Sequence, residues 1–151
     1  MRLKIIQLGL MHLYDCVDLD QKSFKGLWSK SQWRKELTDP KRVCLGIIEW
    51  ETKKLLGVCS AWSVMDELHL TFMAVFPTYQ RRGLGKFLLS ELIKRSKSLQ
   101  INHIHLEVKN NNEPAKALYM SMGFKSTGIR PNFYKDGSDA LLLIKDIKNK
   151  S

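Results

Sequence analysis

The sequence has no apolar run long enough to cross a membrane. A spanning helix needs about 20 consecutive apolar residues, whereas charged or polar side chains interrupt every apolar stretch of this chain before that length. Residues 1–8 read as a strand, and His12 and Asp15 break up any signal-peptide core near the N-terminus. We therefore expect a cytoplasmic protein that does not associate with membranes.

Cysteine is scarce, and its spacing does not form a metal site. The three cysteines, Cys16, Cys44 and Cys59, are an odd number, widely separated and embedded in apolar segments. The sequence contains no C-x-x-C pair and no His/Cys cluster of the kind that binds zinc. We expect buried free thiols and no metal ion, and no base partner for a nucleophilic Cys59 is apparent.

Acidic residues are outnumbered by basic ones. The 151 residues include 25 Lys and Arg but 15 Asp and Glu, which gives a formal net charge of +10. This charge favours an anionic partner, such as nucleic acid, an acidic protein surface or a phosphate-bearing cofactor. The densest stretch, Arg81 to Lys97, holds six cations opposed only by Glu91, and the rest of the charge is spread. Nucleic acid is therefore not the favoured partner, although a basic RNA- or ribosome-binding module remains an alternative.

Repeats, low-complexity tracts and interdomain linkers are also absent, so we expect one domain of mixed α/β structure. The apolar patterns predict the order β-α-α-β-β-β-α-β-α-β-β. The predicted strands cover residues 2–8, 43–48, 55–62, 68–76, 101–108, 124–130 and 140–147, and the predicted helices cover residues 10–20, 29–37, 84–98 and 112–122. The helix at 84–98 joins two strands in a βαβ unit, which makes those strands parallel.

A glycine-containing turn precedes the predicted helix at 84–98. It reads Gln80-Arg81-Arg82-Gly83-Leu84-Gly85-Lys86. Glycines let backbone N–H groups approach a ligand closely, and a helix start carries partial positive charge, so the expected ligand is a phosphate or pyrophosphate. A triphosphate P-loop is disfavoured, because Phe87 stands where that motif needs Ser or Thr and the glycines are too close together.

Two motifs make the chain resemble the GCN5-related N-acetyltransferase (GNAT) superfamily over nearly its whole length. The glycine turn matches the family's Q/R-x-x-G-x-G/A signature. A second and more specific pattern, L-E-V…N-x-x-A-x-x-L-Y-x-x-x-G-F, is matched by Leu106-Glu107-Val108, Asn112, Ala115, Leu118-Tyr119 and Gly123-Phe124. Phe133-Tyr134 and Asp139-Ala140 are similar to the Y-Y…D-A signature of the ribosomal-protein-alanine N-acetyltransferases (RimI type).

The resemblance implies a fold and an activity. It implies one N-acetyltransferase domain over residues 1–147 with a short polar tail at 148–151. The fold would be a mixed, mostly antiparallel sheet, whose central parallel pair of strands splays at an acetyl-CoA site. The activity would be acetyl transfer from acetyl-CoA to the N-terminal α-amine of a protein, with a ribosomal protein as the expected substrate and without a metal.

The family arrangement also assigns roles to residues of this sequence. Glu107 would be the general base and Tyr119 the general acid. Phe133 and Tyr134 would bind the acceptor. The resemblance assigns cofactor binding to a larger set: the main chain of Met73, Ala74 and Val75 at the pantetheine arm and thioester, the pyrophosphate loop of Arg81, Arg82, Gly83, Leu84, Gly85 and Lys86, and Asn112.

The residues themselves leave several alternatives open. By pattern alone Tyr119 is a core aromatic, and Phe133 and Tyr134 either line an acceptor groove or fold onto the core. His105 shares a strand face with Glu107, so it could tune Glu107 or act as a rival base. An α-amine titrates at about 7.7–8.0 and a lysine at about 10.4, so a modest base suffices for an N-terminus. A small amine or a lysine side chain is the alternative acceptor.

Overall fold

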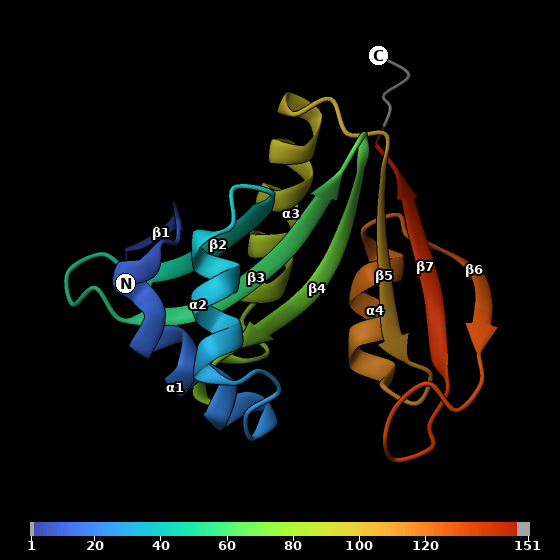
Figure 1. The fold of residues 1–151 in the computed structure, drawn as a ribbon, viewed down its shortest axis with the longest axis horizontal. Helices are drawn as coiled ribbons and strands as arrows, with labels where there is room; N and C mark the ends of the chain where they lie inside the picture. The colour runs from blue at the N-terminus through green and yellow to red at the C-terminus, as the bar shows by residue number, and fades with distance from the viewer. Residues whose placement is uncertain (1, 148–151) are drawn as a thin grey trace.

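A seven-stranded sheet in the order β1-β2-β3-β4-β5-β7-β6 organises the chain (Figure 1). The computed structural model describes residues 2–147, so the predicted tail at 148–151 lies outside the described residues. The strands are β1 (Leu3–Gln7), β2 (Arg42–Glu49), β3 (Leu55–Val64), β4 (Glu67–Val75), β5 (His103–Lys109), β6 (Lys125–Arg130) and β7 (Ala140–Asp146). The helices are α1 (Leu13–Phe24), α2 (Lys30–Thr38), α3 (Leu84–Ser98) and α4 (Glu113–Ser121), with 3-10 turns η1 (Leu10–His12) and η2 (Pro77–Tyr79). The predicted order of strands and helices is confirmed.

Helices cover the two faces of the sheet unequally. In Figure 1, α1 and α2 lie over β2 to β4 on one face, and α3 lies on the other. Leu19 of α1 and Trp33 of α2 are fully buried in one apolar cluster, while Leu88 and Leu92 of α3 are fully buried in a second. Full burial of a leucine is worth about 1.5–3 kcal/mol, so both layers hold the sheet. Within residues 2–147, no helix is long and apolar enough to cross a membrane.

The first helix differs from its predicted bounds for a local reason. Residues 10–12 form the 3-10 turn η1, and α1 runs on to Phe24 before Lys25 ends it in the left-handed region at φ 58°. The buried carboxylate of Asp20 then fixes the connection to α2. It accepts hydrogen bonds from the backbone N–H of Leu27 (2.8 Å) and Trp28 (2.9 Å) and from Trp33 Nε1 (2.9 Å).

A β-bulge interrupts β4 in the middle, where the sequence predicts an uninterrupted strand. The pairing with β3 passes from Phe72 opposite Ser60 to Leu70 opposite Ala61, which leaves Thr71 as the extra residue. One added residue reverses which face the later side chains occupy. Leu70 accordingly packs in the cluster with α3, while Phe72 packs in the cluster with α1 and α2.

The parallel pair β4–β5 is short, and its strands then separate. Pairing is confined to residues 67–69 of β4 and residues 103–105 of β5, in parallel register as predicted. Beyond these three pairs the strands diverge, while β5 continues alongside β7 (Figure 1). The main chain of β4 at residues 71–75 is therefore not paired with β5, and we call the space between these two diverging strand backbones the opening.

Candidate active site

The β4 edge of the opening offers main-chain hydrogen-bonding groups. The N–H of Phe76 donates to the carbonyl of Leu56 in β3 at 2.7 Å. Because main-chain groups alternate between the two edges of a strand, Ala74 also faces β3, and Met73 and Val75 face the opening. The Gln80 side chain donates from Nε2 to the Val75 carbonyl at 3.1 Å, which ties the glycine turn to the end of β4. Of the predicted main-chain set, Met73 and Val75 are thus the two that face the opening.

The glycine turn positions the start of α3 beside that edge. Gly83 precedes the helix at φ 78°, a left-handed conformation that favours glycine, and has no side chain to cap the helix. The first helical bond runs from Phe87 N–H to the Gly83 carbonyl at 3.0 Å, so the N–H groups of residues 84–86 have no intrahelical acceptor. A Cβ at Gly85 would lie 3.3 Å from Leu118 Cδ2, which shows how closely α3 approaches α4. Exposed cations flank these N–H groups: Arg81, Arg82 and Lys86.

Asn112 begins α4 as the sequence predicts. Its side chain accepts a hydrogen bond from the Ala115 N–H at 3.2 Å. Because the oxygen is used for capping, the amide NH₂ is the part of Asn112 that remains for a ligand.

Glu107 lies on β5, and its side chain is on the same face of the sheet as those of His103 and His105. Both carboxylate oxygens lie 3.0 Å from Nε2 of His69 on β4. A carboxylate only accepts, so His69 Nε2 carries the hydrogen. This hydrogen bond lowers the pKa of Glu107 below its ordinary value, against the opposing effect of partial burial. The Glu107 side chain is 24% exposed, so it remains accessible.

His105 acts on Glu107 electrostatically, helping to lower its pKa, but does not hydrogen-bond to it. Its Nε2 bonds to Glu67 instead, and His69 occupies the place next to Glu107. His69 is the residue that the sequence reasoning missed. The sequence predicts that the two strands are parallel but not their register. With residues 67–69 opposite residues 103–105, the odd-numbered polar residues of both strands share one face.

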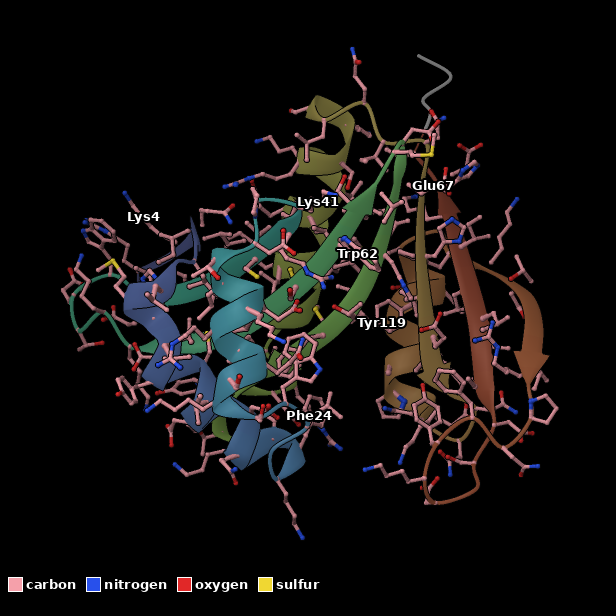
Figure 2. All side chains as sticks on the ribbon, viewed as in Figure 1. Lys4, Phe24, Lys41, Trp62, Glu67 and Tyr119 are labelled. Atoms are coloured by element: carbon pink, nitrogen blue, oxygen red, sulfur yellow. The ribbon has the colours of Figure 1, made fainter. Side chains whose placement is uncertain are left out.

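Tyr119 of α4 is buried where β4 and β5 separate (Figure 2). Its ring packs edge-to-face on Phe124 with centroids 5.6 Å apart. Burial raises the pKa of the Tyr119 hydroxyl well above its ordinary value, so the hydroxyl keeps its hydrogen at neutral pH. The residue is a core aromatic, as its pattern indicates, and it packs in the cluster with α3.

Tyr134 comes to the same place from the loop between β6 and β7. Burial, followed by the negative charge of Glu107, raises the pKa of Tyr134, and Tyr134 in turn acts electrostatically on Tyr119. The loop is fixed by Asp139, whose carboxylate accepts from the Asn132 N–H at 3.0 Å. Tyr134 is therefore within electrostatic range of both Glu107 and Tyr119. Phe133 packs on Tyr134 with centroids 5.0 Å apart and is 41% exposed.

Comparisons with known proteins agree with this architecture. The family model described as the acetyltransferase (GNAT) family matches residues 10–124. A Bacillus subtilis protein provisionally named [ribosomal protein bS18]-alanine N-acetyltransferase is 33% identical over 133 residues, which cover 87% of this chain and 85% of that protein. The Escherichia coli K12 [ribosomal protein bS18]-alanine N-acetyltransferase is 43% identical over 83 residues, covering 53% of this chain and 56% of that protein.

A solved structure extends the similarity to the whole fold. The crystal structure of the ribosomal-protein-S18-alanine N-acetyltransferase from Escherichia coli superposes with a TM-score of 0.91 at 29% identity, and covers 99% of this chain and 97% of that one. The chain therefore belongs to the GNAT family of acetyltransferases.

Proposed function

We propose that this chain transfers the acetyl group of acetyl-CoA to the α-amine of a protein N-terminus, with a ribosomal protein as the substrate. The observation that carries the proposal is the separation of β4 from β5 after three residue pairs, which leaves the main chain of Met73 and Val75 unpaired with β5. The relatives named [ribosomal protein bS18]-alanine N-acetyltransferases support the acceptor class. We assign the activity to residues 1–147 as one domain.

Acetyl-CoA is proposed to lie in the opening between β4 and β5. The Met73 and Val75 main chain hydrogen-bonds the pantetheine arm, and an N–H on this edge stabilises the developing oxyanion. The free N–H groups at residues 84–86 bind the pyrophosphate, which the cations of residues 81–86 neutralise. The NH₂ of Asn112 contacts the cofactor. Ala74, whose main chain faces β3, keeps this edge in position.

Glu107 acts as the general base in this proposal. The amine nitrogen attacks the thioester carbonyl carbon, a C–N bond forms, and the C–S bond breaks. Glu107 accepts the proton that the amine loses, directly or through one water. Its hydrogen bond to His69 orients the carboxylate, which makes His69 a positioning residue.

Tyr119 acts as the general acid. The leaving group is the thiolate of coenzyme A, which needs a proton as the C–S bond breaks. The Tyr119 hydroxyl keeps its hydrogen throughout the pH range in which an α-amine is neutral, so it can always offer that hydrogen to the sulfur. Tyr134, next to Glu107, lines the acceptor side together with Phe133.

The proposal is tested by incubating the protein with acetyl-CoA and a set of acceptors, followed by mass spectrometry. We expect acetylation of peptides that begin with alanine, with the mass added at the α-amine. The matched control is the same peptide with its α-amine formylated and a lysine left free, which should stay unmodified. Acetylation of that lysine, or preferential acetylation of a small polyamine, would show that the acceptor is a lysine side chain or a small amine and not a protein α-amine.

A further inference from the structure

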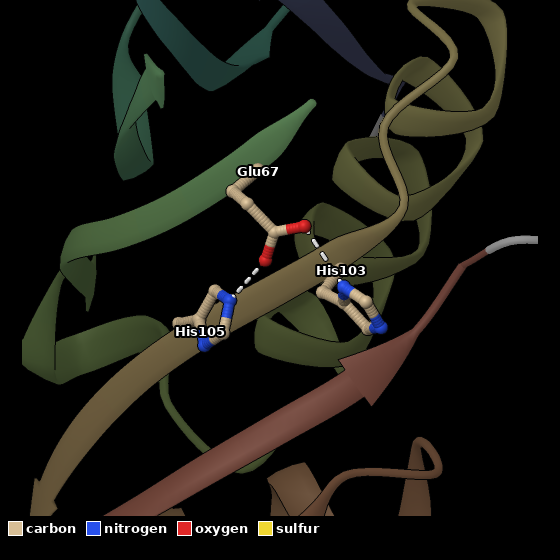
Figure 3. A group of neighbouring side chains, drawn as sticks. All are labelled: Glu67, His103 and His105. Carbon is tan, nitrogen blue, oxygen red and sulfur yellow. Dashed lines mark hydrogen bonds and ion pairs between the residues drawn. The ribbon is translucent and has the colours of Figure 1, made fainter. Parts of the chain in front are cut away.

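Three polar side chains from two strands converge on one face of the sheet. His103 Nδ1 lies 2.8 Å from one carboxylate oxygen of Glu67, and His105 Nε2 contacts the other. Figure 3 shows the carboxylate held between the two imidazole rings. One donor atom from each residue lies within 4.8 Å of the other two. None of these residues has a role in the proposed acetyl transfer.

The backbone holds the three residues in place. His103 and His105 alternate along β5, so both project from the same face. Parallel pairing sets Glu67 opposite His103, and β5 is paired on its other edge with β7 along its whole length. The donors therefore sit on the interior of a hydrogen-bonded sheet rather than on loops, which limits how far they can separate.

The donor set has the chemistry of a transition-metal site. Two imidazole nitrogens and one carboxylate oxygen are ligands that zinc accepts, with bonds of about 2.0–2.2 Å. Tetrahedral geometry at these bond lengths places neighbouring ligand atoms about 3.4 Å apart. The present spread of up to 4.8 Å is wider than this, so the side chains would rotate inward on binding the ion. The three side chains are 34–42% exposed, which leaves a path for the ion and a position for water.

The local charge favours a cation even though the whole chain carries a net charge of +10. Asp66 and Asp146 both act electrostatically on His103, in addition to Glu67. Asn102 bonds to Asp66 and so keeps that carboxylate next to the cluster. Three carboxylates and two neutral imidazoles would thus surround a divalent ion.

We propose that Glu67, His103 and His105 bind one divalent transition-metal ion of the zinc class. Glu67 belongs to β4 and both histidines belong to β5, so the ion joins the two strands at their only paired segment in the described chain. The ion would cross-link β4 and β5 at the residues where they are paired, next to the place where the two strands separate. The proposal does not depend on which amine the protein acetylates.

The test uses protein free of any affinity tag, stripped with a chelator and then desalted. Zinc chloride is titrated by calorimetry, and Co²⁺ serves as a spectroscopic probe of the same site. We expect one ion per chain, Co²⁺ absorption bands typical of tetrahedral coordination, and a Tm that rises with zinc concentration because the ion binds only the folded state. The Co²⁺ spectrum needs no variant, so it remains informative if a substitution unfolds the chain.

Variants assign the ligands. His105→Gln and Glu67→Gln should each weaken zinc binding by about 100-fold or more, since second-shell changes alone cost about 10–100-fold. His12→Gln is the matched control: its ring bonds to Gly9 at the η1 turn and is not part of the cluster, so zinc binding should not change. Absence of stoichiometric binding to the unaltered protein, or unchanged binding by the His103→Gln/His105→Gln double variant, would overturn the proposal and leave a hydrogen-bonded cluster.

Discussion

The carboxylate of Glu107 depends on a partner 38 residues away in the sequence. The motif around Glu107 indicates the residue and its strand, but the motif does not contain His69. Two hydrogen bonds to one ring nitrogen fix where the carboxylate points, and a base that is fixed in place needs less reorganisation when it accepts a proton. At the scale of single residues, the candidate site consists of the proposed base Glu107 with His69 bonded to it, and the buried hydroxyl of Tyr119 as the proposed acid.

Removing the charge of Glu107 tests its role as base. We expect Glu107→Gln to lower kcat by about 10²–10⁴-fold, the usual contribution of a general base, and to leave the affinity for acetyl-CoA unchanged. Steady-state acetyl transfer and calorimetric binding of acetyl-CoA measure the two effects. Glu113→Gln, an exposed acid in the first turn of α4, is the matched control and should retain full activity. Full activity in Glu107→Gln would mean that another group accepts the proton.

Removing the hydroxyl of Tyr119 tests the acid. Tyr119→Phe keeps the ring that packs on Phe124, so we expect little change in Tm. Transfer should slow by about 10²-fold or more, because the leaving thiolate loses its donor. Single-turnover kinetics with an excess of enzyme isolate this step from product release. An unchanged rate would show that the thiolate leaves unaided or is protonated from elsewhere.

At the scale of elements, the start of α3 and the end of β4 act together. Gln80 bonds to Val75 and Gly85 packs on Leu118, so the turn is fixed to β4 and α4 on either side. The bulge at Thr71 sends Phe72 into the cluster with α1 and α2. The contacts of Gln80 and Gly85 hold the free N–H groups of residues 84–86 in a fixed orientation before any ligand binds.

Gly83→Ala separates backbone strain from ligand binding. A Cβ at Gly83 meets no atom within 4 Å, but its φ of 78° is unfavourable for alanine. We expect a loss of stability of about 1 kcal/mol and weaker binding of acetyl-CoA, because the N–H groups of the following turn shift. Gly137→Ala is the matched control, with a φ of 86° and equally open space. Gly137→Ala should lose similar stability in urea unfolding and keep its affinity for acetyl-CoA. An equal loss of acetyl-CoA affinity in both variants would argue against a phosphate-binding turn at residues 83–86.

At the scale of the whole molecule, the sheet consists of two halves joined through three residue pairs. The first half, β1 to β4, is covered by helices on both faces. In the second half, β5, β7 and β6, Figure 1 shows no helix over one face in the described chain. The acids Glu67 and Glu107 lie on that uncovered face, within a chain of net charge +10. Lys109 and Arg130 both pair with Ala140 and so lie on the same face, which therefore carries charges of both signs.

The buried thiols give a prediction for the intact fold. Burial raises the pKa of Cys44 to about 11 and those of Cys16 and Cys59 to about 12, so all three are protonated at neutral pH. Because the thiolate is the reactive form, we expect almost no reaction with a disulfide reagent in the native state. All three thiols should react after unfolding in guanidinium, as followed by absorbance. One thiol that reacts rapidly in the native protein would contradict this packing.

Much of the fold was predictable from the sequence, because its causes are local. The apolar periodicity predicted the order of strands and helices. Asn112 was predicted as a helix cap because its side-chain oxygen can accept from an N–H three residues later, as it does from Ala115. The single helix between β4 and β5 predicted that these strands are parallel. The family resemblance, carried by the pattern at Leu106-Glu107-Val108 and Leu118-Tyr119, indicated Glu107 and Tyr119 as candidate site residues. These features depend on neighbours within one element or one connection.

The tertiary structure alone decided which polar groups meet. His69 rather than His105 holds Glu107, Thr71 forms a bulge, and Glu67 meets both His103 and His105. Each of these outcomes follows from strand register, and a shift of one residue moves a side chain to the other face of the sheet. Register is set by the packing of the whole sheet against its helices, so partners 36 and 38 residues apart cannot be paired from local pattern.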